Sequence, residues 1–88
     1  MKVKYEFAIR QIAGEYVLVP LGRAALQFSG MLTTSEVGAF IFRTLAQETS
    51  LEELKAKLME EYEVDEQTAA ADLEEFLAQL RKLKLLEE

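Results

Sequence analysis

Residues 16–34, YVLVPLGRAALQFSGMLTT, constrain the fold most, because Arg23 is their only charged residue while 30% of the whole chain is charged. Apolar and small residues alternate through this stretch. The pattern predicts a strand, a turn and a further strand whose outer edge is unpaired. Proteins normally guard such an edge with lysine, proline or a covering element. We therefore expect another chain to pair with it.

The chain has 88 residues and contains neither cysteine nor histidine. Its length predicts one small domain over residues 1–88. The missing residue types exclude disulfides, thiolate nucleophiles, histidine acid–base catalysis and Cys/His metal sites. No apolar run approaches the roughly 18–20 residues of a membrane span, and the charged, alternating start does not fit a signal peptide. We expect a cytoplasmic protein with no membrane partner.

The first half of the chain has the strand pattern. Residues 5–12 alternate with period two, which predicts a half-buried strand. Gly14 then allows a tight hairpin turn, and residues 15–19 are rich in residues that favour strands. A third strand follows over residues 24–28 or 31–33, and the sequence leaves open which of the two pieces forms the outer edge.

The second half has the helical pattern, since the apolar period changes from two to about 3.6 after Thr33. Capping boxes that begin at Thr33 and Ser50, and an N-cap at Asp65, predict three helix starts. The predicted helices cover residues 34–47, 51–61 and 66–83. The fold class expected is therefore α+β: a three-stranded antiparallel sheet followed by three α-helices, in a winged helix-turn-helix-like arrangement.

Charge argues against a nucleic-acid partner. Residues 1–44 hold five basic and three acidic residues (net +2), and residues 45–88 hold five basic and thirteen acidic residues (net −8). Phosphates would repel a domain this acidic. The third helix and its N-cap Asp65 together carry five carboxylates before the first basic residue, which does not suit a recognition helix. A winged-helix DNA-binding regulator is therefore kept only as an alternative function.

Catalytic groups are scarce in this sequence. Neighbouring carboxylates such as Glu52 and Glu53 point about 100° apart on a helix, so they cannot share a substrate. The four glycines do not cluster into a phosphate-binding loop. We expect no enzymatic activity and no cofactor.

Binding of another chain remains as the function that fits the unpaired edge. An extended peptide would add as the next strand, and its alternate side chains would enter pockets between the sheet and the third helix. The apolar residues that could line these pockets are Leu26, Phe28, Met31, Leu32, Leu73 and Phe76. Each of them could instead be an ordinary core residue, and the same edge could form a homodimer.

Several short motifs resemble the PqqD-like family of peptide-recognition domains. They are Glu-Val-Gly-Ala-Phe from Glu36, Tyr-x-Val-Asp at Tyr62–Asp65, Ala-Asp-Leu at Ala71–Leu73 and Leu-Leu-Glu at Leu85–Glu87. Their order and spacing match the family over nearly the whole chain. Where the family often has a left-handed glycine before the final Leu-Leu, this chain has Lys84, which costs roughly 1 kcal/mol if that geometry is kept.

The resemblance implies a non-catalytic chaperone that captures the leader segment of a ribosomally synthesised precursor peptide. The leader would lie as an added strand between the third strand and the third helix, and would be presented to a modifying enzyme, often a radical S-adenosylmethionine (SAM) protein. The positions that the resemblance carries over are Ala25, Leu26, Gln27, Phe28, Met31, Leu32 and Thr33 on the strand side and Ala69, Asp72, Leu73 and Phe76 on the helix side.

Overall fold

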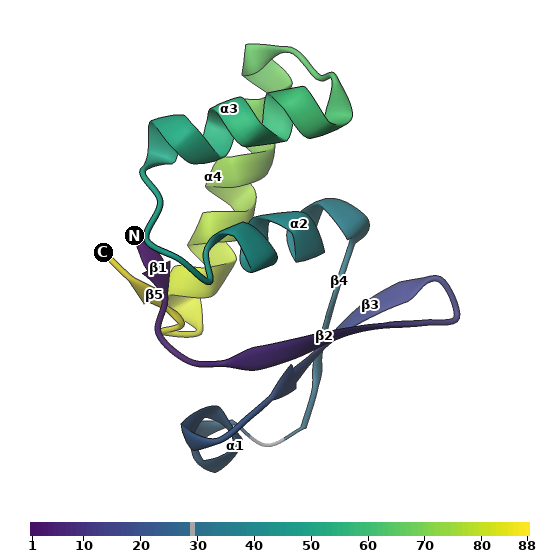
Figure 1. The fold of residues 1–88 in the computed structure, drawn as a ribbon, viewed down its shortest axis with the longest axis vertical. Helices are drawn as coiled ribbons and strands as arrows, with labels where there is room; N and C mark the ends of the chain where they lie inside the picture. The colour runs from purple at the N-terminus through teal and green to yellow at the C-terminus, as the bar shows by residue number, and fades with distance from the viewer. Residues whose placement is uncertain (29) are drawn as a thin grey trace.

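A three-stranded antiparallel sheet and three longer helices make up most of the computed structural model, which describes residues 1–28 and 30–88. The sheet has the order β2-β3-β4, with β2 at Phe7–Ile12, β3 at Glu15–Pro20 and β4 at Leu32–Thr34. The helices that follow are α2 (Glu36–Thr44), α3 (Leu51–Tyr62) and α4 (Glu66–Lys82), and they lie together on one side of the sheet (Figure 1). The predicted α+β class is confirmed.

Strands β2 and β3 form a hairpin with a two-residue turn at Ala13 and Gly14, whose φ angles are 52° and 82°. Both angles are positive, as a turn that matches the twist of the strands requires. Beyond the other end of the ladder, the N–H of Leu21 donates to the carbonyl of Glu6 at 2.9 Å. Because bonded and non-bonded pairs alternate along an antiparallel ladder, the next pair, Phe7 with Pro20, is non-bonded. Pro20 therefore lies where its missing N–H costs the hairpin nothing.

Residues 24–28 do not form the strand that their alternation suggests. Residues Arg23–Gln27 form a short helix, α1, and the edge strand is β4. Only Ala24 of α1 is buried, whereas Leu26 is 86% exposed. Five consecutive residues with good helix propensity favour one helical turn here, and a turn this short shows no 3.6-residue period to reveal it. Of the two pieces left open, the second one forms the edge.

Two of the three predicted helix starts are confirmed and one is wrong. Ser50 and Glu53 make the complete capping box of α3, and Asp65 accepts a hydrogen bond from the Thr68 N–H at 2.7 Å. The backbone N–H of Ser50 lowers the pKa of the Glu53 carboxyl, and that of Thr68 lowers the pKa of the Asp65 carboxyl. Helix α2 is capped by Ser35, not by Thr33. Thr33 cannot cap it because it lies within β4, opposite Val17 of β3.

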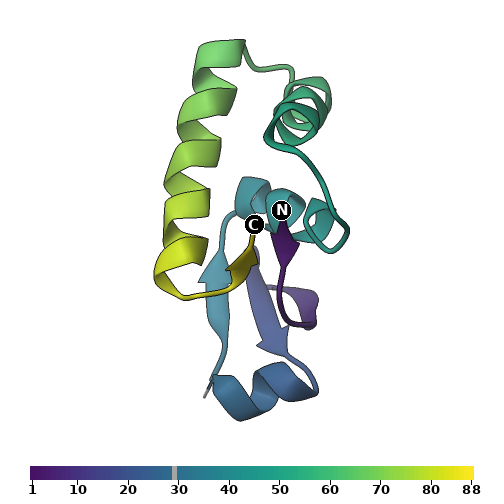
Figure 2. The same ribbon diagram turned by 90° about the vertical axis from the view of Figure 1, so that its left-hand side faces the viewer.

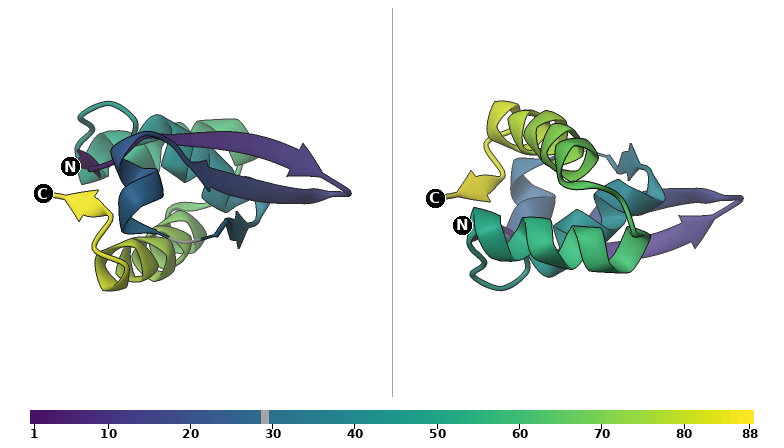
Figure 3. Two further views of the ribbon diagram at one scale, coloured as in Figure 1. Left: turned by 90° about the horizontal axis from the view of Figure 1, so that it is seen from below. Right: turned by 90° about the horizontal axis from the view of Figure 1, so that it is seen from above.

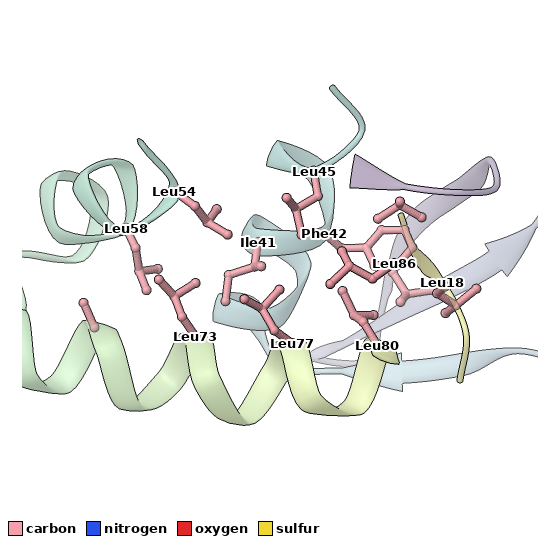
Figure 4. Packing of buried hydrophobic residues seen from close by; sticks show 13 residues of the cluster. Leu18, Ile41, Phe42, Leu45, Leu54, Leu58, Leu73, Leu77, Leu80 and Leu86 are labelled. Carbon is pink, nitrogen blue, oxygen red and sulfur yellow. The ribbon is translucent and has the colours of Figure 1, made fainter. Parts of the chain in front are cut away.

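The core lies between α4, α2 and α3 and extends to the sheet. Leu73, Leu77 and Leu80 of α4 point toward α2 and α3, where Ile41 is fully buried (Figure 4). On the sheet side, the rings of Phe7 and Phe42 pack edge to face with their centroids 5.2 Å apart. This packing fixes the position of α4 relative to the sheet, and so determines the width of the space between α4 and β4.

Two short strands hold the ends of the chain together. Strands β1 (Lys2–Val3) and β5 (Leu86–Glu87) pair antiparallel, and the two termini lie beside each other (Figure 2). Leu85 and Leu86 are buried. The β1–β5 pair covers the core next to the C-terminal end of α4.

Helix α4 ends in a Schellman motif with Lys84 as the left-handed residue, at a φ of 60°. The N–H of Leu85 donates to Leu80 O at 2.9 Å and that of Lys84 to Arg81 O at 3.0 Å. The chain therefore keeps the left-handed geometry in spite of the lysine side chain. We expect Lys84→Gly to raise the free energy of unfolding by about 1 kcal/mol, since glycine adopts this conformation without steric cost.

Urea denaturation monitored by circular dichroism would measure this change. The control is Lys82→Gly, at the last residue of α4, which should instead lower stability, by at most about 1 kcal/mol. A Lys84→Gly protein no more stable than the parent would show that the lysine side chain makes a compensating contact.

Candidate peptide-binding groove

A cavity of 390 Å³ lies between the edge strand β4 and helix α4. Strand β4 is on the α4 side of the sheet, whereas β2 is on the far side (Figure 3). One wall comes from β4 and the start of α2, and the other comes from α4. The lining residues are Thr33, Thr34, Ser35, Val37, Gly38, Ile41, Asp72, Glu75, Phe76 and Gln79.

The floor of the groove depends on Gly38. A Cβ atom at this position would lie 2.0 Å from Thr34 Oγ1 and 2.9 Å from Phe76 Cε1, and both distances are shorter than real contacts allow. Gly38 thus lets a strand residue and a helix residue approach α2 together. The glycine inside α2, which is costly on helix propensity alone, is explained by this close packing.

The open edge of the groove presents the backbone of Thr33. Phe7 with Pro20 is a non-bonded pair, so Ile9 with Leu18, two pairs further along the ladder, is non-bonded too. Leu18 of β3 therefore points its N–H and C=O groups away from β2 and toward β4. Leu18 therefore bonds Leu32, its partner in β4, and by alternation Thr33 points its N–H and C=O groups away from the sheet. Among the described residues, no hydrogen bond outside the sheet engages the backbone of Thr33.

The groove is acidic on its helix wall. Asp72 and Glu75 lie on α4, and no basic residue is found among the described residues that line the cavity. Thr33, Thr34, Ser35 and Gln79 add polar groups at the rim, whereas Val37, Ile41 and Phe76 provide apolar surface. An unpaired strand edge beside an apolar floor can hold an extended peptide by backbone pairing. The acidic wall favours a peptide with a basic side chain on the α4 side.

The predicted site residues fall into three groups in the structure. Thr33, Asp72 and Phe76 line the groove. Ala69 and Leu73 face the core and are at most 1% exposed, and Leu32 is half-buried against the core. The rest lie at or near α1: Ala25, Leu26, Gln27 and Met31 are exposed, and the ring of Phe28 packs on Tyr5 and Phe7.

Sequence reasoning missed the part of the groove that the end of β4 and the start of α2 supply. Thr34, Ser35, Val37, Gly38 and Ile41 were expected to belong to a longer helix or to its core. The α4 wall carried a readable signal, because Asp72, Glu75, Phe76 and Gln79 follow the spacing of one helical stripe. Gly38 was a second readable signal, because glycine in the middle of a helix is unfavourable unless another group packs closely against it.

Two kinds of feature are not found among the described residues. They contain no group of three or more His, Cys, Asp or Glu side chains placed to hold a metal ion. None of the helices that they form has the length and apolar character needed to cross a membrane.

Comparisons with known proteins agree with this arrangement. Residues 15–86 match the family model described as coenzyme PQQ synthesis protein D (PqqD). Among solved structures, the chain is similar to TbiB1 in complex with the TbiA(beta) leader peptide, with 30% identity and a TM-score of 0.70 over 99% of this chain and 95% of that one. No curated protein matches the chain.

Proposed function

Since the chain belongs to the PqqD family, we propose that it binds the leader segment of a ribosomally synthesised precursor peptide in the groove between β4 and α4. One observation carries the proposal: an unpaired strand edge and a helix enclose a cavity of 390 Å³, lined by polar side chains together with Val37 and Phe76. The similar structure of TbiB1, which was solved with a leader peptide, supports the same class of ligand.

The leader binds by strand addition in this proposal. Its backbone pairs with the outward N–H and C=O groups of Thr33, which extends the sheet to a fourth strand. Because strand side chains alternate between two faces, every second leader residue points into the cavity above Gly38 and Phe76. The remaining leader side chains face solvent, so specificity rests on alternate positions.

The chain acts without catalysis of its own in this proposal. It holds the leader and presents the rest of the precursor to a separate modifying enzyme, for which the family resemblance points to a radical SAM protein. The sequence has no cysteine or histidine, so the chain offers no thiolate or imidazole ligand for an iron–sulfur cluster or a zinc ion. The chain therefore contributes binding and orientation, and the partner enzyme supplies the chemistry.

A titration with the leader half of a precursor peptide encoded beside this protein tests the proposal. Fluorescence polarisation should give micromolar or tighter binding. In ¹⁵N-labelled protein the peptide should shift the amide resonances of Thr33, Thr34 and Phe76, which surround the groove. Shifts confined to α1, or no binding by a folded protein to any neighbouring precursor, would contradict the proposed site.

The peptide itself offers a second test of strand addition. Methylating single leader amide nitrogens should weaken binding at every second position, because only alternate N–H groups of an added strand face β4. A periodicity near 3.6 would instead mean that the leader binds as a helix.

A further inference from the structure

A second groove lies at the opposite edge of the sheet, along β2. Its volume is 320 Å³, and it runs between residues 2–9 and the end of α2. Strand β2 has β3 on one side only, and it lies at the margin of the sheet on the side away from α4 (Figure 3). This β2-edge groove shares no lining residue with the groove beside β4.

The backbone of β2 points into this second groove at two residues. Leu21 and Glu6 are hydrogen-bonded to each other, and bonded and non-bonded pairs alternate from there along the ladder. The non-bonded pairs therefore include Phe7 with Pro20 and Ile9 with Leu18. Phe7 and Ile9 therefore direct their N–H and C=O groups outward, and both residues line the groove. Within residues 1–28 and 30–88, no backbone bond outside the ladder engages either of them.

The floor of the β2-edge groove is apolar and its rim is basic. Tyr5, Phe7 and Ile9 are half-buried, and Phe42 closes the bottom against Phe7. Lys2, Lys4 and Arg43 stand around this floor with one carboxylate, Glu6, so the rim has three positive charges and one negative charge.

Among residues 1–28 and 30–88, none of these three cations takes part in an ion pair. The ion pairs among the described residues are Met1–Glu48, Lys55–Glu66 and Arg81–Glu88. None of them includes Lys2, Lys4 or Arg43. A protein with a net charge of −6 thus gathers around one apolar groove three cations that have no ion pair within the described residues, and such a rim attracts acidic ligands.

We propose that the β2-edge groove binds an extended acidic segment of a partner protein, in which acidic residues alternate with apolar ones. The segment pairs with the outward backbone groups of Phe7 and Ile9, its apolar side chains cover the floor, and its carboxylates meet Lys2, Lys4 and Arg43. A second copy of this chain would bring another rim of the same net sign, so its charge opposes self-pairing here. This surface is additional to leader binding and is open while the leader occupies the other groove.

The test uses a fluorescent octapeptide that alternates glutamate with leucine, with its lysine–leucine counterpart as the control peptide. The acidic peptide should bind the full chain, and the lysine peptide should not. Affinity should fall as salt rises from about 20 mM to about 200 mM, because the attraction is between partly exposed charges. Peptide amides methylated at alternate positions should lose binding with a period of two.

Charge reversal at Lys4 and Arg43 should weaken binding of the acidic peptide by at least about tenfold. Both side chains are exposed, so the double variant should fold. The matched control reverses Lys57 and Lys82, which are exposed on α3 and α4 and change the net charge equally; it should bind like the parent.

Several outcomes would overturn the proposal. They are no binding of the acidic peptide, equal binding of the lysine peptide, and equal loss in both charge-reversed proteins. Displacement of bound leader peptide by the acidic probe would mean that the probe uses the groove beside β4. A doubled mass in sedimentation that is lost when Lys4 and Arg43 are reversed would assign the edge to a second copy. Leader binding is measured separately in the same proteins, so a failure of one proposal is distinct from a failure of the other.

Discussion

A Thr33→Pro protein is expected to fold normally and to lose leader-peptide binding. Thr33 lies at the centre of β4 with its N–H directed away from the sheet, so proline removes a donor that the fold does not use. The added strand would lose that bond and meet the proline ring. A lost partner for a buried acceptor costs about 1–3 kcal/mol, so binding should weaken by at least about tenfold. Fluorescence polarisation with the labelled leader measures the loss.

Two controls separate the backbone of Thr33 from its surroundings. Thr33→Val keeps the N–H and the branched shape, so it should bind the leader like the parent. Leu26→Glu would disrupt capture if residues 24–28 formed the edge, but Leu26 is 86% exposed on α1 and should be neutral. Retained binding in Thr33→Pro, or lost binding in Leu26→Glu, would place the peptide elsewhere. Circular dichroism checks that each variant is folded.

Gly38→Ala is expected to lower the stability of the domain and to deform the groove, although alanine is the better helix former. Helix propensity alone predicts a gain of about 1 kcal/mol. The new Cβ, however, would lie 2.0 Å from Thr34 Oγ1 and 2.9 Å from Phe76 Cε1. Threonine has few χ1 rotamers to escape into, and overpacking of this kind costs about 1–3 kcal/mol. We expect a net loss in urea denaturation and a weaker affinity for the leader.

A double-mutant cycle with Thr34→Ala tests this explanation. Removing Thr34 Oγ1 relieves the shorter of the two contacts, so Gly38→Ala should be less harmful in the Thr34→Ala protein than in the parent. Equal effects in the two backgrounds would mean that Phe76 alone resists the added methyl group. A stabilised Gly38→Ala protein would show that strand and helix move apart without cost.

The fold was predictable where the pattern was long enough to show its period. The hairpin over β2 and β3 and the caps Ser50 and Asp65 follow from residues close together in sequence. Helix α1 was missed because alternation over five residues also fits a single helical turn. Thr33, Thr34 and Ser35 are all acceptable N-caps by residue type. Pairing with β3 decides among them, and that pairing is a tertiary contact.

The candidate site was predictable only in outline, as a strand edge beside the last helix. Phe76 and Leu73 are equally apolar in the sequence, yet one lines the groove and the other is fully packed in the core. Each residue of a helix is rotated by about 100° from the one before it, so Leu73 and Phe76 project from α4 in different directions. The packing of α4 on α2 determines which of these directions faces the strand. Gly38 shows the same limit, since its cost was visible in the sequence but the two side chains that require it were not.

The pairing of β1 with β5 has a consequence for protein architecture. Residues 2–3 and 86–87 lie side by side, at the end of the molecule opposite the hairpin tip (Figure 1). A domain whose entry and exit points are adjacent can be spliced into a surface loop of another protein without stretching either one. The fold is thus suited to be an inserted domain within a larger polypeptide, and both edges of its sheet would stay open there.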